Sequence, residues 1–382
     1  MSSSSRHERL EKCVNVTAAV FREPGKPLTI ETVQLAGPEA GEVLVKVVAS
    51  GICHSDLHVV KGEWSTSAPL VLGHEGAGIV EAVGTGVTTV SPGDHVVLSW
   101  MPYCRRCHYC LAGRPNLCEL VESTAYNSVM LDGTTRLSQA GEPVYSYLAT
   151  GSFANWAVVP ETAAIRIRDD APLDKVSLVG CAVATGIGAV ANTARVHMGS
   201  SALVIGCGGV GLSTVSGAAI AGASQVIAVD INDANLDRAR ALGATHTLNS
   251  RTDDVLSALP AITGKTGVDY AFEAIGLPAT IELAYEALAP GGTAVVVGQV
   301  AEGKKISIDP FVMSDREKTL TGCNYGSCRP PIDFPILVDL YMNDRLPLDS
   351  LIERAIGIDE INDAFDAMIR GETARRVIIH EH

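Results

Sequence analysis

The stretch at residues 73–86 places a histidine and a glutamate side by side, His74 and Glu75, among five glycines. Glycine allows tight turns and a close approach of the backbone to other groups. So many glycines around one His–Glu pair predict a crowded site. Cys53 lies upstream on another turn flanked by glycine, and Cys181 follows an apolar run far downstream. Because thiolates and imidazoles are common zinc ligands, these residues are candidates for one metal centre.

A second group of cysteines has the spacing of a structural zinc site. Two residues separate Cys104 from Cys107 and Cys107 from Cys110, and Cys118 follows after a gap of seven. Four thiolates at such gaps can converge on a tetrahedral ion, and four sulfur ligands leave no position for a substrate. We therefore expect a zinc ion that holds the loop at residues 101–119 together.

A glycine-rich turn between a predicted strand and a predicted helix indicates a coenzyme site. The apolar residues 201–205 are typical of a buried parallel strand. The turn after them contains Gly206, Gly208, Gly209, Val210 and Gly211. These glycines would let the backbone approach a pyrophosphate at a helix N-terminus. Asp230 ends the next predicted strand, where its carboxylate would bind the ribose hydroxyls and repel a 2′-phosphate, which predicts NAD rather than NADP.

Composition excludes several classes of protein. The chain has 382 residues, 47% of them hydrophobic, and can bury a large core, which we expect in two domains. A formal net charge of −14 without a concentrated basic patch argues against a nucleic-acid or anionic-membrane surface. Residues 1–12 are polar, lack the apolar core of a signal peptide, and are expected to be a disordered tail. No apolar run reads as a membrane span, so we expect a cytoplasmic protein with its remaining cysteines reduced.

The two halves of the chain differ in their patterns. Short β-branched runs at residues 14–20, 42–50, 77–83 and 94–98 predict an irregular β-rich unit with long loops. From about residue 182 predicted strands and helices alternate, with strands at residues 201–205, 225–229, 245–248, 268–272, 293–297 and 318–322. Six strands with helices between most of them predict an α/β doubly wound sheet. The tail from residue 325 does not continue the alternation, so we assign residues 13–182 and 325–382 to one domain and residues 183–324 to the other.

The chain resembles a zinc-dependent alcohol dehydrogenase of the medium-chain dehydrogenase/reductase superfamily. The Gly-His-Glu signature, the four-cysteine loop and the turn at residues 206–211 occur in that family's order and spacing, and the match covers everything after the N-terminal tail. The resemblance implies a GroES-like β-rich catalytic domain, a Rossmann coenzyme domain with a doubly wound parallel sheet, and a cleft between them. It also implies a homodimer or homotetramer that binds two zinc ions per chain, NAD and a small-molecule alcohol or aldehyde.

Carried over to this sequence, the resemblance makes Cys53, His74 and Cys181 the ligands of a catalytic zinc. Three protein ligands with one open position suit a metal that must bind substrate. Glu75 matches an acid beside the metal that tunes it or briefly ligates it. Ser55 and His58 match a proton relay, in which the hydroxyl takes the alcohol proton and the histidine passes it to solvent.

The resemblance also assigns residues to the coenzyme. His54 and Arg375 match positions near the pyrophosphate, and Thr185 matches a residue beside the nicotinamide. The sequence departs from the family at one position. Five residues after the acid that binds ribose, here Asp230, many relatives carry a lysine, whereas this chain has Asn235. The missing contact predicts weaker binding and faster release of the coenzyme.

The substrate is less sharply specified. Positions that match the family's alcohol pocket are Trp100, Tyr147, Leu148, Gln299 and Asn324. Aromatic walls bury apolar groups well, so we expect primary alcohols and aldehydes with an alkyl or aryl tail. In places the chain is similar to the class III group, which oxidises S-hydroxymethylglutathione. That group holds the glutathione carboxylate with an arginine where this chain has Glu122, so a thiol adduct is disfavoured but stays an alternative.

Two further alternatives come from other classes. A zinc-independent quinone or enone reductase would share the fold but lack the set of Cys53, His74 and Cys181. A non-catalytic zinc module that binds protein or nucleic acid is opposed by the acidic charge and by the complete coenzyme fingerprint.

Overall fold

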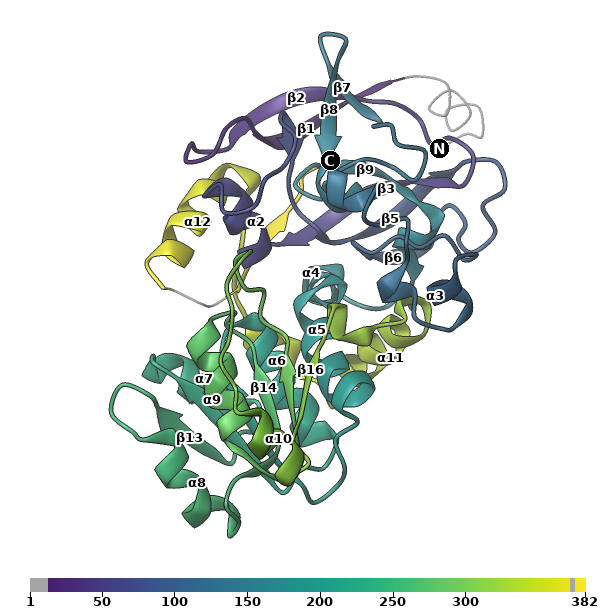
Figure 1. The fold of residues 1–382 in the computed structure, drawn as a ribbon. Coiled ribbons are helices and arrows are strands. Elements are labelled where there is room, and N and C mark those ends of the chain that lie inside the picture. Colours follow the sequence, from purple (N-terminus) through teal and green to yellow (C-terminus); the bar gives the residue numbers. More distant parts are fainter. Residues whose placement is uncertain (1–12, 372–374) are drawn as a thin grey trace. The chain divides into compact units, whose positions relative to one another are not determined.

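The computed structural model describes residues 13–371 and 375–382, which form two compact units (Figure 1). The first unit contains the described chain up to Cys181, the segment Arg329–Asn343 and the chain from Ile352 onwards. The second unit contains Ala182–Cys328 and Asp344–Leu351. The tail predicted at residues 1–12 lies outside the described residues.

The first unit contains a closed barrel and a larger sheet. Five strands form the barrel in the order β1 (Val14–Phe21), β2 (Thr29–Leu35), β7 (Leu137–Gln139), β8 (Glu142–Ser146) and β4 (Leu70–Val71). The sheet runs in the order β10 (Ala164–Arg166), β6 (His95–Leu98), β5 (Glu75–Val83), β3 (Glu42–Gly51), β18 (Arg375–Ile379) and β17 (Ile352–Ile356), and β9 (Trp156–Pro160) also pairs with β3.

Strand β3 lies inside that sheet and buries a row of valines on one face. Val43, Val45 and Val47 are fully buried in a cluster that also contains Val80 and Val96 of the neighbouring strands. Branched side chains of this kind pack well on a pleated surface. The β-rich character predicted for this half is confirmed, whereas β2, β4 and β7 to β10 were not among the predicted strands.

Helices of four to thirteen residues connect the strands of the first unit. They are α2 (His54–Val60), α3 (His108–Leu111), α4 (Leu173–Val176), η5 (Ser177–Gly180), α11 (Pro330–Met342) and α12 (Ile361–Ile369). Cys53, which the sequence places on a turn, is the N-cap residue of α2.

The second unit is a six-stranded parallel sheet of doubly wound topology. Its order is β13 (His246–Asn249), β12 (Gln225–Asp230), β11 (Ser201–Ile205), β14 (Val268–Glu273), β15 (Leu288–Val296) and β16 (Thr319–Gly322). The helices of this unit are α5 (Ala182–Gly188), η6 (Ala189–Ala194), α6 (Gly209–Ile220), α7 (Asp233–Ala241), α8 (Val255–Thr263), α9 (Pro278–Glu286) and α10 (Pro310–Asp315). All six predicted strands are present, and the strand order is that of a dinucleotide-binding fold.

The units divide differently from the predicted domains at three places, the first of which is Ala182, now in the second unit. Residues 325–328 belong to the second unit, because the turn η7 (Tyr325–Ser327) packs on α5. Gly326 has a φ of +64° there, and a Cβ atom on it would lie 2.3 Å from the carbonyl oxygen of Ala184. The segment Asp344–Leu351, which we assigned to the first domain, also belongs to the second unit.

Within residues 13–371 and 375–382, no single helix has the length and apolar character needed to cross a membrane, although the bent pair Leu173–Gly180 and Ala182–Ala194 meets both criteria together.

Candidate metal centres and coenzyme site

Three distant segments of the first unit bring their donor atoms together. Cys53 precedes α2, His74 lies between β4 and β5, and Cys181 follows η5. One donor atom from each of these residues and one from Glu75 all lie within 4.8 Å of one another, and all four residues are buried. The structure therefore gathers the three predicted ligands and the predicted neighbouring acid at one point.

Asp56 orients the histidine of this cluster. Its Oδ1 accepts hydrogen bonds from His74 Nδ1 at 3.2 Å and from the Gly73 amide at 3.0 Å, and its Oδ2 accepts one from the Cys53 amide at 3.1 Å. Because both Asp56 oxygens already accept from backbone amides, the side chain acts as an acceptor here, so His74 Nδ1 carries the proton and Nε2 has a free lone pair. His74 Nε2 is buried and has no hydrogen-bond partner, as a metal-binding nitrogen requires.

No role was predicted for Asp56 from the sequence. Its position offers one signal, since it is the third residue after the N-cap Cys53 and its side chain accepts from the N-cap amide as in a capping box. That signal predicts a helix start but not the contact with His74, which comes from another segment.

The predicted crowding by glycines is confirmed at two positions. A Cβ atom on Gly51 would lie 2.3 Å from Glu75 Oε2. Gly73 has a φ of +89°, and a Cβ atom on it would lie 2.5 Å from the Phe153 ring. A side chain at either position would therefore displace a neighbour of the metal cluster.

Arg375 is the positive charge of the cluster. Its Nη2 donates to Glu75 Oε1 at 2.7 Å and lies 3.8 Å from Cys53 Sγ, and its Nη1 donates to the Ile52 carbonyl at 2.5 Å. Burial raises the pKa of Glu75 to about 7, although the guanidinium opposes this shift. Arg375 thus offsets the negative charge of the thiolates. Its predicted contact with the coenzyme stays a prediction.

These residues fit a catalytic zinc. Two thiolates and one imidazole are a donor set found in zinc sites that keep a fourth position open. Glu75 lies close enough to the same point to act as a further ligand. The unpartnered His74 Nε2 is the observation that the protein part of the site does not explain without a metal.

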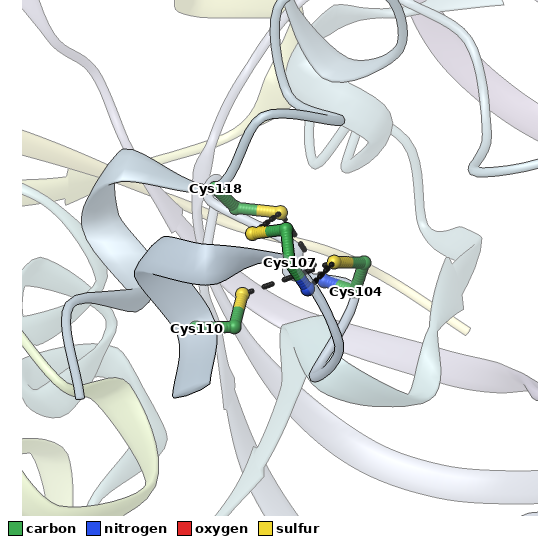
Figure 2. Close-up of side chains that lie close together, drawn as sticks. All are labelled: Cys104, Cys107, Cys110 and Cys118. Atoms are coloured by element: carbon green, nitrogen blue, oxygen red, sulfur yellow. Dashed lines mark hydrogen bonds between the residues drawn. The ribbon is translucent and has the colours of Figure 1, made fainter. Parts of the chain in front are cut away.

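The four-cysteine loop forms a second cluster (Figure 2). The Sγ atoms of Cys104 and Cys110 lie 3.9 Å apart, and those of Cys107 and Cys118 lie 4.0 Å apart. Sulfur ligands about 2.3 Å from a shared tetrahedral zinc lie about 3.8 Å from one another. The amides of Cys107 and Cys104 donate to Cys104 Sγ and Cys118 Sγ at 3.2 and 3.3 Å, which stabilises the thiolates. The predicted closed site therefore fits zinc in its geometry.

The glycine-rich turn of the second unit has the features of a phosphate-binding loop. Gly206 has a φ of +91°, and a Cβ atom on Gly211 would lie 1.7 Å from the Gly206 carbonyl oxygen. Both glycines are therefore required by the fold itself. A Cβ atom on Gly208 would meet no protein atom within 4 Å, so the fold does not require a glycine there. The open space beside Gly208, at the N-cap of α6, fits the close approach of a pyrophosphate.

Asp230 is fixed at the end of β12. Its Oδ2 accepts from the Cys207 amide at 2.8 Å, and its Oδ1 accepts from the Asn232 amide at 2.9 Å and from Asn235 Nδ2 at 3.3 Å. Asn235, where many relatives have a lysine, is buried and turns towards this carboxylate. The faster release of coenzyme that we expect from this departure stays a prediction.

The predicted relay residues lie on α2. Ser55 Oγ is 3.7 Å from Cys53 Sγ, whereas His58 is one-third exposed and bonds to Glu63. In the described chain no hydrogen bond joins Ser55 to His58, so a relay needs a bridging group between them. His54 is exposed at the start of α2, and Thr185 is buried in α5 of the second unit.

The predicted pocket residues are distributed over both units. Tyr147 is buried, and its ring centroid lies 5.7 Å from that of His74 in an edge-on arrangement. Trp100 and Leu148 also belong to the first unit, and Gln299 and Asn324 to the second. That these five residues line one pocket stays a prediction.

Two protein-family models match the chain. A family model described as the alcohol dehydrogenase GroES-like domain matches residues 39–169, and a model described as zinc-binding dehydrogenase matches residues 209–343. These matches confirm the fold class predicted for the two parts of the chain.

Three similar proteins illustrate the relationship. The S-(hydroxymethyl)glutathione dehydrogenase of Paracoccus denitrificans is 40% identical over 373 residues, 95% of this chain and 99% of that protein. The class-3 alcohol dehydrogenase of Cereibacter sphaeroides is 42% identical, again over 95% of this chain and 99% of that protein. The crystal structure of benzyl alcohol dehydrogenase from Acinetobacter calcoaceticus superposes with a TM-score of 0.92 at 36% identity, covering 96% of this chain and 100% of that one.

Proposed function

Because the chain belongs to the zinc-dependent alcohol dehydrogenase family of medium-chain dehydrogenases, we propose that it interconverts primary alcohols and aldehydes with NAD as the coenzyme. The observation that carries this proposal is the buried set of Cys53, His74 and Cys181, in which His74 Nε2 has no hydrogen-bond partner. Three protein ligands leave a fourth position for a substrate oxygen.

The residues around the site prepare it for this chemistry. When bound by Cys53, His74 and Cys181, zinc supplies Lewis-acid stabilisation of negative charge on a substrate oxygen. Asp56 holds His74 with Nε2 towards the donor cluster. Arg375 places one positive charge beside Glu75 and Cys53 Sγ, which offsets part of the negative charge of the buried cluster.

The proton of the alcohol would leave through α2. Ser55 Oγ lies beside Cys53 and takes this proton, and His58 transfers it to solvent because its ring is one-third exposed. When bound on the second unit, NAD supplies the hydride acceptor. The negative charge of Asp230 supports NAD over NADP, since it would repel a 2′-phosphate.

The surroundings of His74 support an apolar substrate. The Tyr147 ring packs edge-on against the His74 ring, so an aromatic wall lies next to the donor cluster. We propose alkyl and aryl primary alcohols on this basis. The structural likeness to the benzyl alcohol dehydrogenase from Acinetobacter calcoaceticus agrees with an aryl substituent.

A second candidate function is oxidation of the adduct of formaldehyde and glutathione. It is favoured by the 40% identity to a relative named S-(hydroxymethyl)glutathione dehydrogenase. It is opposed by Glu122, which is exposed and negatively charged where the class III group has an arginine for the glutathione carboxylate. A carboxylate at this position repels the glutathione carboxylate instead of binding it.

The deciding experiment is an NAD-coupled assay of the zinc-loaded protein. Straight-chain primary alcohols and benzyl alcohol are compared with formaldehyde in the presence and absence of glutathione. We expect turnover of the alcohols and little dependence on glutathione. Glu122→Arg is the informative variant, because restoring the positive charge should increase kcat/KM for the glutathione adduct by roughly tenfold or more, as expected for one charge-assisted contact.

Two results would contradict the proposal. Glutathione-dependent formaldehyde oxidation that exceeds the turnover of every alcohol would establish the second candidate. Turnover that persists after removal of both zinc ions by a chelator would exclude the metal centre from the reaction and favour a zinc-independent reductase.

A further inference from the structure

The residues that follow α2 close around His58. His58 Nδ1 forms a hydrogen bond with Glu63 Oε2, and the His58 ring stacks on Trp64 with centroids 4.7 Å apart and planes inclined by 26°. The amides of Glu63 and Trp64 both donate to the His58 carbonyl oxygen, at 2.9 and 3.4 Å. Gly62 has a φ of +74°, which lets the chain reverse at this point. One turn thus places a carboxylate on an edge of the imidazole and an indole on its face.

The carboxylate decides which nitrogen of the imidazole carries a proton. The hydrogen bond from His58 lowers the pKa of Glu63, so this side chain is ionised and can only accept. Nδ1 must then be the donor, and the neutral ring has its lone pair on Nε2. In free solution both tautomers would be populated, and only one of them presents a basic Nε2.

We propose that Glu63 is a positioning residue that holds His58 in the Nδ1–H tautomer, so that Nε2 is the atom that receives the substrate proton. Trp64 contributes to the same positioning, because its stacking fixes the plane of the His58 ring. The inference rests on the proposed function, because it assigns His58 to the proton path of alcohol oxidation.

Every proton in the proposed transfer from the alcohol to solvent is accounted for. Ser55 Oγ takes the alcohol proton and gives its own to a bridging water molecule, which in turn gives one to His58 Nε2. The imidazolium then releases one proton to water and returns to the Nδ1–H tautomer. Glu63 stays ionised throughout and exchanges no proton.

An ordinary surface ion pair is the competing explanation. The Glu63 side chain is 48% exposed, and exposed pairs of this kind contribute little to stability. If Glu63 had no positioning role, its removal would leave the tautomer of His58 and the rate of alcohol oxidation unchanged. The two explanations therefore differ in what a variant of Glu63 does to His58 itself.

The first test is the tautomer of His58 in the zinc-loaded, full-length protein. Nitrogen-15 NMR of labelled histidine at alkaline pH distinguishes Nδ1–H from Nε2–H, and the signal of His58 is assigned by its absence in His58→Gln. We expect the Nδ1–H form in the parent protein and in Glu63→Gln, which keeps an acceptor oxygen. In Glu63→Ala the Nε2–H form should predominate.

Glu23→Gln is the matched control. Glu23 is an exposed carboxylate on a turn against the end of α2, where the Gly25 amide donates to the Val60 carbonyl at 2.7 Å. The Glu23→Gln substitution removes one negative charge near α2, as Glu63→Gln does. Unlike Glu63→Gln, it changes no side chain that contacts His58. The tautomer and the oxidation rate should stay as in the parent protein.

The second test is kinetic. Glu63→Ala should lower kcat for alcohol oxidation roughly 3- to 10-fold, a fraction of what a general base contributes, with KM within about twofold. In a His58→Gln background the same substitution should have no further effect, because Glu63 acts only through His58. Glu63→Gln should retain more activity than Glu63→Ala.

The outcomes separate this inference from the proposed function. An Nδ1–H tautomer that persists in Glu63→Ala, or an additional loss of kcat in the His58→Gln background, would overturn the role of Glu63. A parent protein that oxidises no alcohol would overturn the proposed function, and the proton path with it, whereas the NMR result would still decide whether Glu63 fixes the ring.

Discussion

At the scale of single residues, the metal cluster depends on a side chain that is not a ligand. Asp56 is fully buried and binds His74 together with the amides of Gly73 and Cys53. It therefore fixes the segments that carry two of the three predicted ligands. A buried carboxylate of this kind persists only because its oxygens accept several hydrogen bonds.

We predict that Asp56→Asn weakens the catalytic zinc without unfolding the protein. The asparagine side chain has the same size as the aspartate side chain, but its NH₂ group can only donate. It would therefore face a backbone N–H group from which the carboxylate now accepts a hydrogen bond. Loss of such a supporting partner typically lowers metal affinity 10- to 100-fold. The measurement is the amount of zinc that the protein retains during titration with a chelator. The zinc of the cysteine loop, which the substitution should not affect, serves as the internal reference.

Asp237→Asn is the control for this substitution, because the Asp237 side chain is 72% exposed and lies on α7 of the second unit. Zinc retention equal to that of the parent protein in Asp56→Asn would show that Asp56 does not support the metal.

At the scale of elements, residues 103–114 of the cysteine loop include no buried residue. Within α3 no residue is buried, and Leu111 is 75% exposed. One further attachment is Glu161, which accepts from Arg105 at 2.9 Å and from the amides of Thr88 and Thr89 at 2.7 and 2.9 Å. The order of this loop therefore depends on its metal.

We predict that Cys110→Ser removes the zinc of the loop and leaves the other zinc in place. Three sulfur ligands do not close the site, so the backbone around the exposed Arg105 and Arg106 should become mobile enough for trypsin to cleave it. Metal analysis should give about one zinc per chain instead of two. Resistance to trypsin equal to that of the parent protein would contradict a structural role for this metal.

The glycine-rich turn permits a matched pair of variants. A Cβ atom on Gly208 meets no protein atom within 4 Å, so Gly208→Ala should change the free energy of unfolding by less than about 0.5 kcal/mol. The same methyl group would occupy the predicted path of the pyrophosphate and should weaken NADH binding about tenfold or more, measured by fluorescence titration.

Gly211→Ala, in contrast to Gly208→Ala, should lower the stability of the fold. Its Cβ atom would lie 1.7 Å from the Gly206 carbonyl oxygen, so α6 must shift and stability should fall by about 1–3 kcal/mol. If Gly208→Ala binds NADH as tightly as the parent protein, the coenzyme does not lie at this turn.

At the scale of the whole molecule, the chain beyond residue 350 completes the first unit. Strand β18 pairs with β3 and carries Arg375, which contacts Glu75 across a separation of 300 residues in the sequence. His380 follows this strand, and its Nε2 donates to the Ser152 carbonyl at 3.0 Å. Ser152 in turn donates its amide to the Gly73 carbonyl at 2.9 Å, next to His74.

We predict that the buried His380 makes stability depend on pH. Burial lowers its pKa from 6.5 to about 4, so between these values the unfolded chain binds a proton that the folded chain does not. The contribution of neutral His380 is therefore present above pH 6.5 and is lost as the pH falls towards 4. From pH 7 to pH 5 this loss amounts to about 2 kcal/mol.

The measurement is denaturant unfolding of the parent protein and of His380→Gln at a series of pH values. Glutamine does not ionise in this range, so the stability advantage of the parent over the variant should shrink by about 2 kcal/mol between pH 7 and pH 5. A difference that stays constant with pH would show that His380 is not buried in its neutral form.

Local patterns in the sequence determined the chemistry of this protein. The four cysteines of the loop and the turn at residues 206–211 could be identified because ligand spacing and strand–turn–helix order are short-range properties. Cys53, His74 and Cys181 are far apart in the sequence, and the resemblance to zinc-dependent alcohol dehydrogenases joined them into one predicted set. The six strands of the second unit could be predicted for the same reason, since each is a continuous apolar run.

Tertiary structure alone decided which partners these residues have. The contact of Asp56 with His74, the pairing of Arg375 with Glu75 and the short barrel strands such as β4 and β7 depend on segments that are distant in the sequence. Burial and hydrogen-bond satisfaction select such partners only after the chain has packed, and no local pattern encodes them. Even the nearby Glu63 needed the folded turn after α2 to meet His58.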